Sequence, residues 1–288
     1  MQISIIEILK AILFGIVEGI TEWLPISSTG HMILLNEFVK LDVSPEFWNL
    51  FLVVIQLGAI LAVVLLFWKT IWPFKKVKTR SGNTKVVFSK PTMILWLKVL
   101  VACIPAGVIG ILFDDWIDEH FYNAIVVGAA LIIVGVLFLI IETLNKNKVP
   151  RVDRLRDLTF KDAFLIGVFQ LVAAVFPGTS RSGATILGGL MIGVSRRVAS
   201  KFTFILAIPV MFGASLLKIV KYGFRFSGYE LLILVIGMLV AFLVSILIIT
   251  FMMNHIRKHD FRIFGIYRII LGALVLLYFL VLKAPVVY

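Results

Sequence analysis

The stretch FWNLFLVVIQLGAILAVVLLFW, residues 47–68, contains no charged side chain and decides the fold class. An α-helix rises about 1.5 Å per residue, so a helix of this length crosses the roughly 30 Å hydrocarbon core of a bilayer. Residues 121–141 and 231–256 have the same character. The whole chain is 61% hydrophobic and 15% charged, whereas a soluble domain is about 25% charged. The sequence therefore predicts a multi-pass membrane protein.

Six segments are long and apolar enough to be transmembrane helices. They are residues 47–68, 93–113, 121–142, 201–221, 230–254 and 264–283. No polar segment is long enough for a separate soluble domain, so we expect one all-α membrane domain. Cys103, the only cysteine, lies inside a predicted span, which excludes an internal disulfide. Glu7, Glu18 and Glu22 interrupt the first apolar stretch, so we expect no cleavable signal peptide.

The charges between the predicted spans indicate how the chain is oriented. Loop 69–90 contains seven basic residues and no acidic one, whereas loop 114–120 contains four acidic residues and no Lys or Arg. Because basic loops stay in the cytoplasm, the first loop should lie inside and the second outside. Loop 144–162 and residues 257–262 should also lie inside, while the alternation places residues 218–225 outside although they are basic. The basic residues between the spans, which set the membrane topology, thus explain the net charge of +12, and we expect no nucleic-acid partner.

The N-terminal segment does not fit the pattern of a full span. Residues 4–24 are mostly apolar but lead into Pro25 and the polar run SSTGH, residues 27–31. The apolar stretch that follows, residues 32–35, is too short to cross a membrane. We therefore expect a re-entrant helix pair over residues 4–38, with the polar run where the chain reverses direction.

A second segment has the same design. Residues 163–176 would form a helix of only about 21 Å at about 1.5 Å per residue, and they lead into Pro177 and the polar run GTSRS, residues 178–182. We expect a second re-entrant pair over residues 163–194. Polar turns at membrane depth are stable only where protein or a water-filled cavity surrounds them.

The two segments resemble each other when the sequence is shifted by 152 residues. The identical pairs are Ala11 and Ala163, Leu13 and Leu165, Gly15 and Gly167, Pro25 and Pro177, Ser28 and Ser180, and Leu35 and Leu187. Each segment begins a unit that continues with three predicted spans. We therefore expect an inverted-topology repeat of residues 1–143 and 144–288. In such repeats the functional site lies near the membrane midplane, where the two halves meet.

Glu18 and Glu22 are four residues apart, so both carboxylates lie on one face of the first half-helix. A charge at the bilayer centre costs about 2.5–3.5 kcal/mol even on insertion scales. Two neighbouring carboxylates also repel each other, so a cation, a shared proton or a polar cavity must compensate. The alternative is an exposed acidic pair near a helix end. Because Pro25 and the polar run follow directly, we favour a functional pair.

The first polar run contains three hydroxyls and an imidazole, from Ser27, Ser28, Thr29 and His31. Ser and Thr are good N-caps for a returning helix, so a purely structural role is one interpretation. A histidine beside them favours chemistry, since histidine is the common acid, base or metal ligand near neutral pH. Both roles are compatible when they fall on different hydroxyls.

The composition of the second polar run is typical of an anion-binding site. Its candidate ligands are Gly178, Thr179, Ser180, Arg181, Ser182 and Thr185. Hydroxyls and free N–H groups at a helix start bind phosphate oxygens, and the Arg181 guanidinium has a planar fork that matches phosphate. The alternative is an arginine that reaches to the membrane interface, which the expected midplane position disfavours. Together the two runs contain the groups that phosphoryl transfer requires.

At these residues the sequence resembles the bacterial undecaprenyl-pyrophosphate phosphatase family, which is known for bacitracin resistance. EGITEWLPISSTGH, residues 18–31, is similar to its first signature, and PGTSRSGAT, residues 177–185, to its second. The similarity continues through residues 54–58 and 266–268, and so covers essentially the whole chain. The family usually has one residue fewer between the glutamine, here Gln170, and the proline of the second signature. This extra residue weakens the case for a direct role of Gln170, whose role stays open, but not the case for Arg181.

The resemblance implies hydrolysis of the C55 polyprenyl pyrophosphate at the outer face of the bacterial plasma membrane, which recycles the cell-wall lipid carrier. It also implies a divalent cation, Mg²⁺ or Ca²⁺, for which carboxylates and substrate phosphates are typical ligands. Glu18 and Glu22 would hold the metal or activate a nucleophile, and Ser27 or His31 would attack or relay a proton. The pyrophosphate-binding residues would be Ser28, Thr29, Gly178, Thr179, Ser180, Arg181, Ser182 and Thr185. A phospho-enzyme and direct attack by water both stay open, as does a homodimer among the surrounding membrane lipids.

Two other classes of protein compete with a phosphatase. A polyprenyl-phosphate transporter or flippase would also have inverted repeats with broken helices, and the same chain could carry both activities. The dense set of hydroxyls, imidazole and carboxylates exceeds what anion binding alone needs, and so favours an enzyme. A purely structural or assembly protein is the third class, and ionisable groups inside the membrane argue against it.

Overall fold

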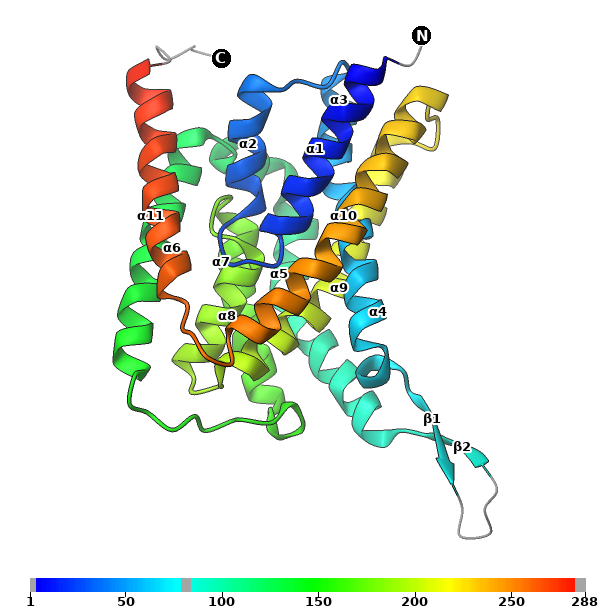
Figure 1. The fold of residues 1–288 in the computed structure, drawn as a ribbon, viewed down its shortest axis with the longest axis vertical. Helices are drawn as coiled ribbons and strands as arrows, with labels where there is room; N and C mark the ends of the chain where they lie inside the picture. The colour runs from blue at the N-terminus through cyan, green and yellow to red at the C-terminus, as the bar shows by residue number, and fades with distance from the viewer. Residues whose placement is uncertain (1–3, 79–83, 283–288) are drawn as a thin grey trace.

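The computed structural model describes residues 4–78 and 84–282, and helices dominate this part of the chain (Figure 1). Six helical segments within it are long and apolar enough to cross a membrane. They are Pro45–Ile71, Lys90–Phe113, Ala124–Asn145, Arg196–Tyr222, Gly228–His255 and Arg262–Val281. The prediction of six spans in a helical multi-pass membrane protein is confirmed.

The helices of these spans are α3 (Pro45–Val54), α4 (Gln56–Ile71), α5 (Lys90–Phe121), α6 (Ala124–Asn145), α9 (Arg196–Tyr222), α10 (Gly228–His255) and α11 (Arg262–Leu277). Four shorter helices are α1 (Ile5–Thr21), α2 (Ser28–Phe38), α7 (Phe160–Val175) and α8 (Arg181–Met191). A 3₁₀ turn covers Leu155–Asp157, and a π-helical turn at Tyr278–Leu282 follows α11.

Three predicted features differ in the structure. The span expected over residues 47–68 is divided into α3 and α4 at Ile55, beside a close contact between Gly58 and the Met238 carbonyl of α10. The acidic loop expected at residues 114–120 is helical, because α5 continues to Phe121 and the next helix begins only after its cap at Asn123. An acidic segment at a membrane boundary does not have to be irregular, because a helix keeps its backbone hydrogen bonds when it extends into water.

The third difference is a β-hairpin in the basic loop 69–90. Strands β1 (Phe74–Lys78) and β2 (Thr84–Phe88) pair antiparallel, with Phe74 opposite Phe88. The strands read FKKVK and TKVVF, so valine and phenylalanine, which favour strands, lie among the basic residues of this loop. The hairpin projects from one end of the molecule (Figure 1).

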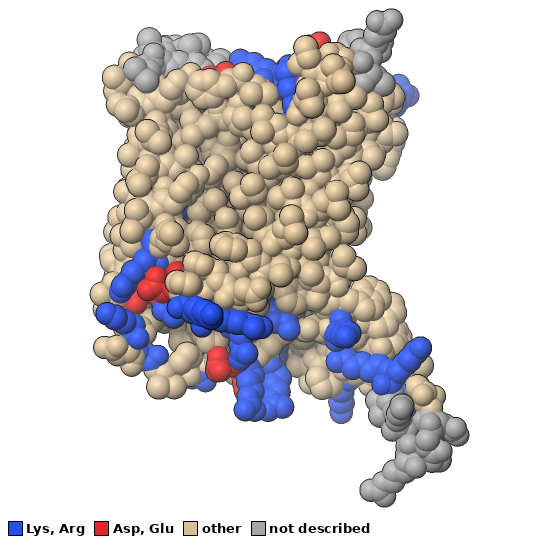
Figure 2. Space-filling model, viewed as in Figure 1, with Lys and Arg blue, Asp and Glu red and all other residues tan. Residues whose placement is uncertain are grey.

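The basic loops gather at one end of the bundle, as the positive-inside rule predicts. The hairpin, the α6–α7 connection and the α10–α11 connection lie at this end, and the two termini lie at the opposite end (Figure 1). Figure 2 shows Lys and Arg side chains along the hairpin end and a broad uncharged surface beside it. The end of α9, with the basic residues Lys218 and Lys221, lies at the end with the termini (Figure 1).

Two close helix pairs place the elements that carry the site. Along α6 and α11, a Cβ at Gly135 would lie 2.7 Å from the Gly265 carbonyl oxygen, and one at Gly272 would lie 2.7 Å from that of Gly128. Along α1 and α10, a Cβ at Gly15 would likewise lie 2.7 Å from a backbone oxygen. Glycines let helix backbones approach closely inside a membrane, where packing replaces the hydrophobic effect. Both α1 and α11 are thereby held directly against a full span.

Candidate active site

The first turn between short helices, residues 22–31, is called the first tip here. Pro25 ends the helical course of α1, and Ser27 then has φ 73°, a left-handed conformation that is unusual for a residue with a side chain. The Ser27 hydroxyl accepts a hydrogen bond from the Gly30 N–H at 3.3 Å and so caps α2. Ser27 is buried, whereas Ser28 and Thr29 at the start of α2 are partly exposed.

The second tip, residues 176–185, repeats this geometry between α7 and α8. Ser180 has φ 69°, and its hydroxyl accepts from the Gly183 N–H at 3.1 Å. The caps therefore make Ser180 equivalent to Ser27, although the shift of 152 residues had paired it with Ser28. The first residues of the two helices, Ser28 and Arg181, are then equivalent as well.

Glu22 is the point where the two tips meet. Its Oε1 accepts a hydrogen bond from Arg181 Nη2 at 2.9 Å, and its Oε2 accepts one from the Ser28 hydroxyl at 2.9 Å. The Ser182 hydroxyl donates to the Glu22 main-chain carbonyl at 3.0 Å. The carboxylate is buried and the guanidinium nearly so, which strengthens their attraction. A carboxylate, a hydroxyl and a guanidinium predicted from distant segments are thus in contact.

Two of the candidate phosphate ligands, Thr185 and Thr179, are buried instead of facing an open site, and Thr185 supports Arg181. The Thr185 hydroxyl is buried, donates to the Arg181 carbonyl and accepts from the Thr203 hydroxyl, both at 2.8 Å. Arg181 Nη1 donates to the Thr203 carbonyl at 2.9 Å, and the guanidinium lies over the Trp23 ring. Thr179 is also buried. These contacts orient the guanidinium before any ligand binds.

Glu18 lies one helical turn before Glu22 and is almost fully buried. Its Oε1 has no hydrogen-bond partner among the described residues. A buried and unpartnered carboxylate oxygen is costly, so this atom fits a cation, a proton or a water molecule. No cluster of three or more His, Cys, Asp or Glu side chains occurs in the described part of the chain. A divalent cation here would therefore depend on the two glutamates together with phosphate oxygens.

His31 lies beside the first tip and turns toward α11. Its Nδ1 lies 2.6 Å from the Ser27 carbonyl oxygen, and its Nε2 lies 2.7 Å from the Tyr267 hydroxyl. The two rings are parallel within 4°. A carbonyl can only accept, so Nδ1 carries a proton, and in the neutral ring Nε2 accepts from Tyr267. No hydrogen bond joins His31 to Ser28 or Glu22 in the described residues.

Two residues of α11 were not among the candidates from the sequence. Tyr267 holds His31, and Arg268 is fully buried with its guanidinium against the backbone of both tips. A charged residue inside the apolar segment 264–283 is the signal that points to Arg268, because an ionisable group inside a span is functional by default. Gln170 is buried with neither amide atom hydrogen-bonded, so no described contact joins it to the tips.

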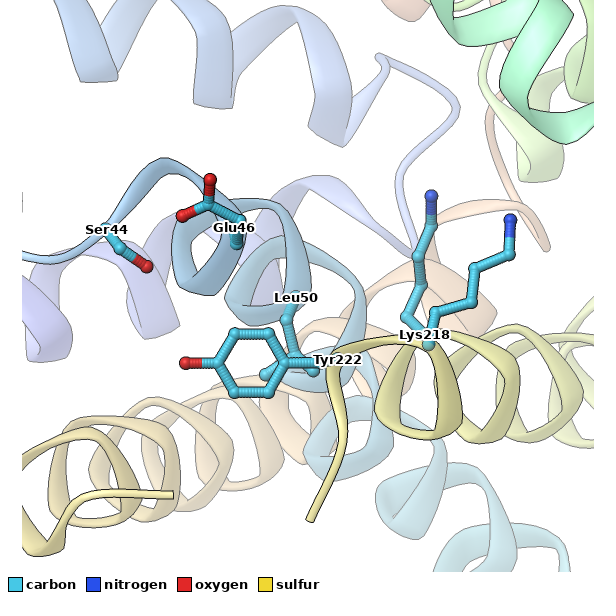
Figure 3. A pocket seen from close by; sticks show the side chains of 6 residues that line it. Ser44, Glu46, Leu50, Lys218 and Tyr222 are labelled. Carbon is cyan, nitrogen blue, oxygen red and sulfur yellow. The ribbon is translucent and has the colours of Figure 1, made fainter. Parts of the chain in front are cut away.

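A surface hollow of about 440 Å³ lies apart from the tips. It is lined by Ser44, Glu46, Leu50, Lys218, Lys221 and Tyr222, between the start of α3 and the end of α9 (Figure 3). None of these residues belongs to either tip. The candidate site residues thus lie in the tips and not in this hollow.

Comparison with known proteins places the chain in a family. The model of the family described as bacitracin resistance protein BacA matches residues 11–274, which include both tips. An undecaprenyl-diphosphatase of Desulfitobacterium hafniense is 61% identical over 276 residues, which cover 96% of this chain and 97% of that protein. An undecaprenyl-diphosphatase of Enterococcus faecalis is 55% identical over 96% of this chain and 99% of its own length. The chain therefore belongs to the bacitracin resistance protein BacA family.

Proposed function

We propose that this chain hydrolyses undecaprenyl diphosphate to undecaprenyl phosphate and inorganic phosphate at the junction of the two tips, recycling the cell-wall lipid carrier. The family and the names of its relatives carry the activity and substrate. The observation that carries the site is the position of Glu22, which accepts from a hydroxyl of one tip and from a guanidinium of the other. A base, a nucleophile and a fixed positive charge are the parts that phosphoryl transfer needs.

In the proposed first step Ser28 is the nucleophile and Glu22 the base. The Ser28 Oγ attacks the terminal phosphorus, the bridging P–O bond breaks, and undecaprenyl phosphate leaves with the electrons of that bond. The proton of the hydroxyl passes to Glu22 Oε2, to which it is already hydrogen-bonded. Water then hydrolyses the phosphoserine, which releases inorganic phosphate and restores the hydroxyl. Ser27 suits this role less well, because its buried oxygen caps the Gly30 N–H.

Arg181 connects substrate binding to the chemical step. A pyrophosphate offers its guanidinium better acceptors than the single Glu22 oxygen it now holds, because bidentate charge-assisted bonds to phosphate are strong. When Arg181 binds the substrate, Glu22 becomes free to take the Ser28 proton. The same guanidinium then meets the charge that develops on the transferring phosphoryl group.

Glu18 and Glu22 would hold the divalent cation, Mg²⁺ or Ca²⁺, for which the unpartnered Glu18 oxygen is the supporting observation. When bound, the cation supplies positive charge that neutralises the pyrophosphate. Thr29 and Ser180, each partly exposed in its tip, would complete the set of phosphate donors, whereas the buried Ser182 hydroxyl donates to the Glu22 carbonyl. His31, oriented by Tyr267, is available to pass protons between the first tip and water.

We also propose that the two short helix pairs are re-entrant and belong to an inverted repeat of residues 1–143 and 144–288. In support, α1 begins at the end with the termini and α7 at the hairpin end, and each pair turns back inside the bundle (Figure 1). The equal caps at Ser27 and Ser180 further support the repeat. By the positive-inside rule the hairpin end is cytoplasmic, and the active site would open to the outer face.

A lipid flippase is not favoured as the function of this chain. The relatives that share more than half of its sequence are named as phosphatases. Direct contact between a hydroxyl and a carboxylate serves proton transfer, whereas transport of an anion needs only donors and positive charge.

The test is phosphate release from undecaprenyl diphosphate by purified protein, compared with the Glu22→Gln variant. Glutamine keeps the shape of the side chain but removes the base, so kcat should fall by roughly 10²–10⁴-fold while binding of the anionic lipid is largely kept. Glu46→Gln, an exposed substitution in α3, is the matched control and should match the wild type. Normal turnover by Glu22→Gln would contradict the role of that residue, and an inactive wild type would contradict the activity itself.

A further inference from the structure

Arg268 of α11 joins the backbones of the two tips. Its side chain has no solvent exposure. Nη1 donates to the Pro25 carbonyl of the first tip at 3.1 Å. Nη2 donates to the Gly178 and Thr179 carbonyls of the second tip at 2.9 and 2.8 Å. One planar guanidinium therefore spans two segments that lie about half the chain apart in sequence.

The environment of this guanidinium is unusual because no acidic side chain bonds to it among the described residues. Its hydrogen-bond acceptors there are all main-chain carbonyls, and Nε has no partner. Burying a cation without a carboxylate partner costs free energy, so the fold keeps Arg268 buried in spite of that cost.

The packing of α11 against α6 fixes the position of Arg268. A Cβ on Gly135 of α6 would come within 3.2 Å of the Arg268 Cβ, so glycine at that position lets the arginine-bearing face approach closely. The preceding residue, Tyr267, holds His31 of α2. Two consecutive residues of a full span thus contact the first tip, and one of them also contacts the second.

We propose that Arg268 is a positioning residue that fixes the two tips at the separation in which Ser28 and Arg181 both reach Glu22. The proposal rests on the proposed function and deepens it. The first tip carries Glu22 and Ser28, and the second carries Arg181, so the separation of the tips decides whether the guanidinium meets the base and the nucleophile. Each hydrogen bond of Arg268 goes to the backbone of one tip or the other, which constrains the tips and leaves their side chains free for substrate.

A positioning role of Arg268 predicts that its loss affects kcat much more than KM. Arg268→Met removes both donors at similar side-chain length, so the tips lose their common support. A misplacement of about 1 Å costs roughly 100-fold in rate, and we expect kcat to fall by about that factor. KM should change only a few-fold because Arg181 is still present. Arg262→Met changes an arginine in the first turn of the same helix, whose side chain bonds to Thr143 and Asp260. It is the control and should keep wild-type kcat.

A double-mutant cycle with Arg181 distinguishes positioning from general stability. If Arg268 acts by placing Arg181, then Arg268→Met should cost less than about 10-fold in kcat in an Arg181→Met background, since the group to be positioned is gone. A merely structural role predicts equal losses in both backgrounds, together with a lower thermal midpoint. Equal losses would overturn the proposal.

Arg268→Lys keeps the test decisive if the methionine variant does not accumulate in folded form. Lysine keeps the charge but has one nitrogen in place of the fork that spans the tips. We expect it to fold and to keep kcat at least about 10-fold below the wild type. Full activity of Arg268→Lys would show that charge alone matters and would overturn the positioning role. Because wild type is assayed in parallel, failure of this proposal is separate from failure of the phosphatase activity.

Discussion

The two neighbouring serines of the first tip illustrate how much the structure adds at the scale of a single residue. The family resemblance left the nucleophile open between Ser27, His31 and water and assigned Ser28 to substrate binding, because composition cannot distinguish adjacent hydroxyls. Their hydrogen bonds do distinguish them, since Ser27 accepts from a backbone N–H while Ser28 donates to Glu22. The left-handed turn at Ser27 causes the difference by directing the two side chains apart.

Substitution of the two serines should therefore have different effects. Ser28→Ala removes the proposed nucleophile, so phosphate release should fall by at least about 10²-fold with little change in the thermal midpoint. Ser27→Ala removes a helix cap and should cost about 0.5–2 kcal/mol of stability. Ser27→Gly, which accommodates the positive φ, should be close to wild type in activity. If Ser27→Gly is inactive and Ser28→Ala is active, the assignment of the nucleophile is wrong.

The unpartnered oxygen of Glu18 leads to a second prediction at this scale. We expect turnover to require a divalent cation, since two neighbouring buried carboxylates otherwise repel both each other and the pyrophosphate. Excess EDTA should abolish phosphate release, and addition of Mg²⁺ or Ca²⁺ should restore it. Parallel treatment with EGTA, which prefers Ca²⁺, distinguishes the two ions. Full turnover in EDTA by protein shown to be metal-free would exclude the cation.

At the scale of elements, the sequence predicted what periodicity and charge encode. Six spans and two short polar-ended segments follow from local composition. The break at Ile55, the helical end of α5 and the β-hairpin were missed. Each depends on tertiary contacts or on a short local pattern, which the mean hydropathy of a long window does not show. The sequence shows Arg268 as a charge inside a predicted span. Its partners could not be predicted, because they are main-chain carbonyls of distant segments and any residue type has such a carbonyl.

The two tips should share one aqueous compartment if the active site opens outward. Thr29 and Ser180 are partly exposed, one in each tip. Cysteine at either position, in a Cys103→Ser background, should react with a membrane-impermeant thiol reagent added from outside. Labelling of position 180 only from the cytoplasmic side would contradict an outward-facing phosphatase and favour a site that faces inward. Cysteine at Val149, an exposed position in the α6–α7 connection at the hairpin end, is the opposite-side control.

At the scale of the whole molecule, close helix contacts at glycines hold the bundle together. These contacts position the helices that support the tips. Gly58 of α4 lies against the Met238 carbonyl of α10, and α10 in turn packs on α1, which carries Glu18 and is capped by Glu22. Helices cannot use the hydrophobic effect to associate in lipid, so such contacts depend on the absence of a side chain. A single methyl group at this contact should therefore act on the fold as a whole.

Gly58→Ala tests this dependence because the new methyl group would overlap the Met238 backbone, which cannot turn away as a side chain can. Overpacking of this kind costs about 1–3 kcal/mol, so the thermal midpoint in detergent should fall and activity should fall with it. Gly213→Ala in α9 is the matched control, since its Cβ would meet no atom within 4 Å. Alanine is the better helix former by about 0.8–1 kcal/mol, so the control should be unchanged or slightly more stable. If both variants have the wild-type midpoint, the contact at Gly58 does not hold α4 against α10, and the support of the tips comes from the α1–α10 and α6–α11 pairs.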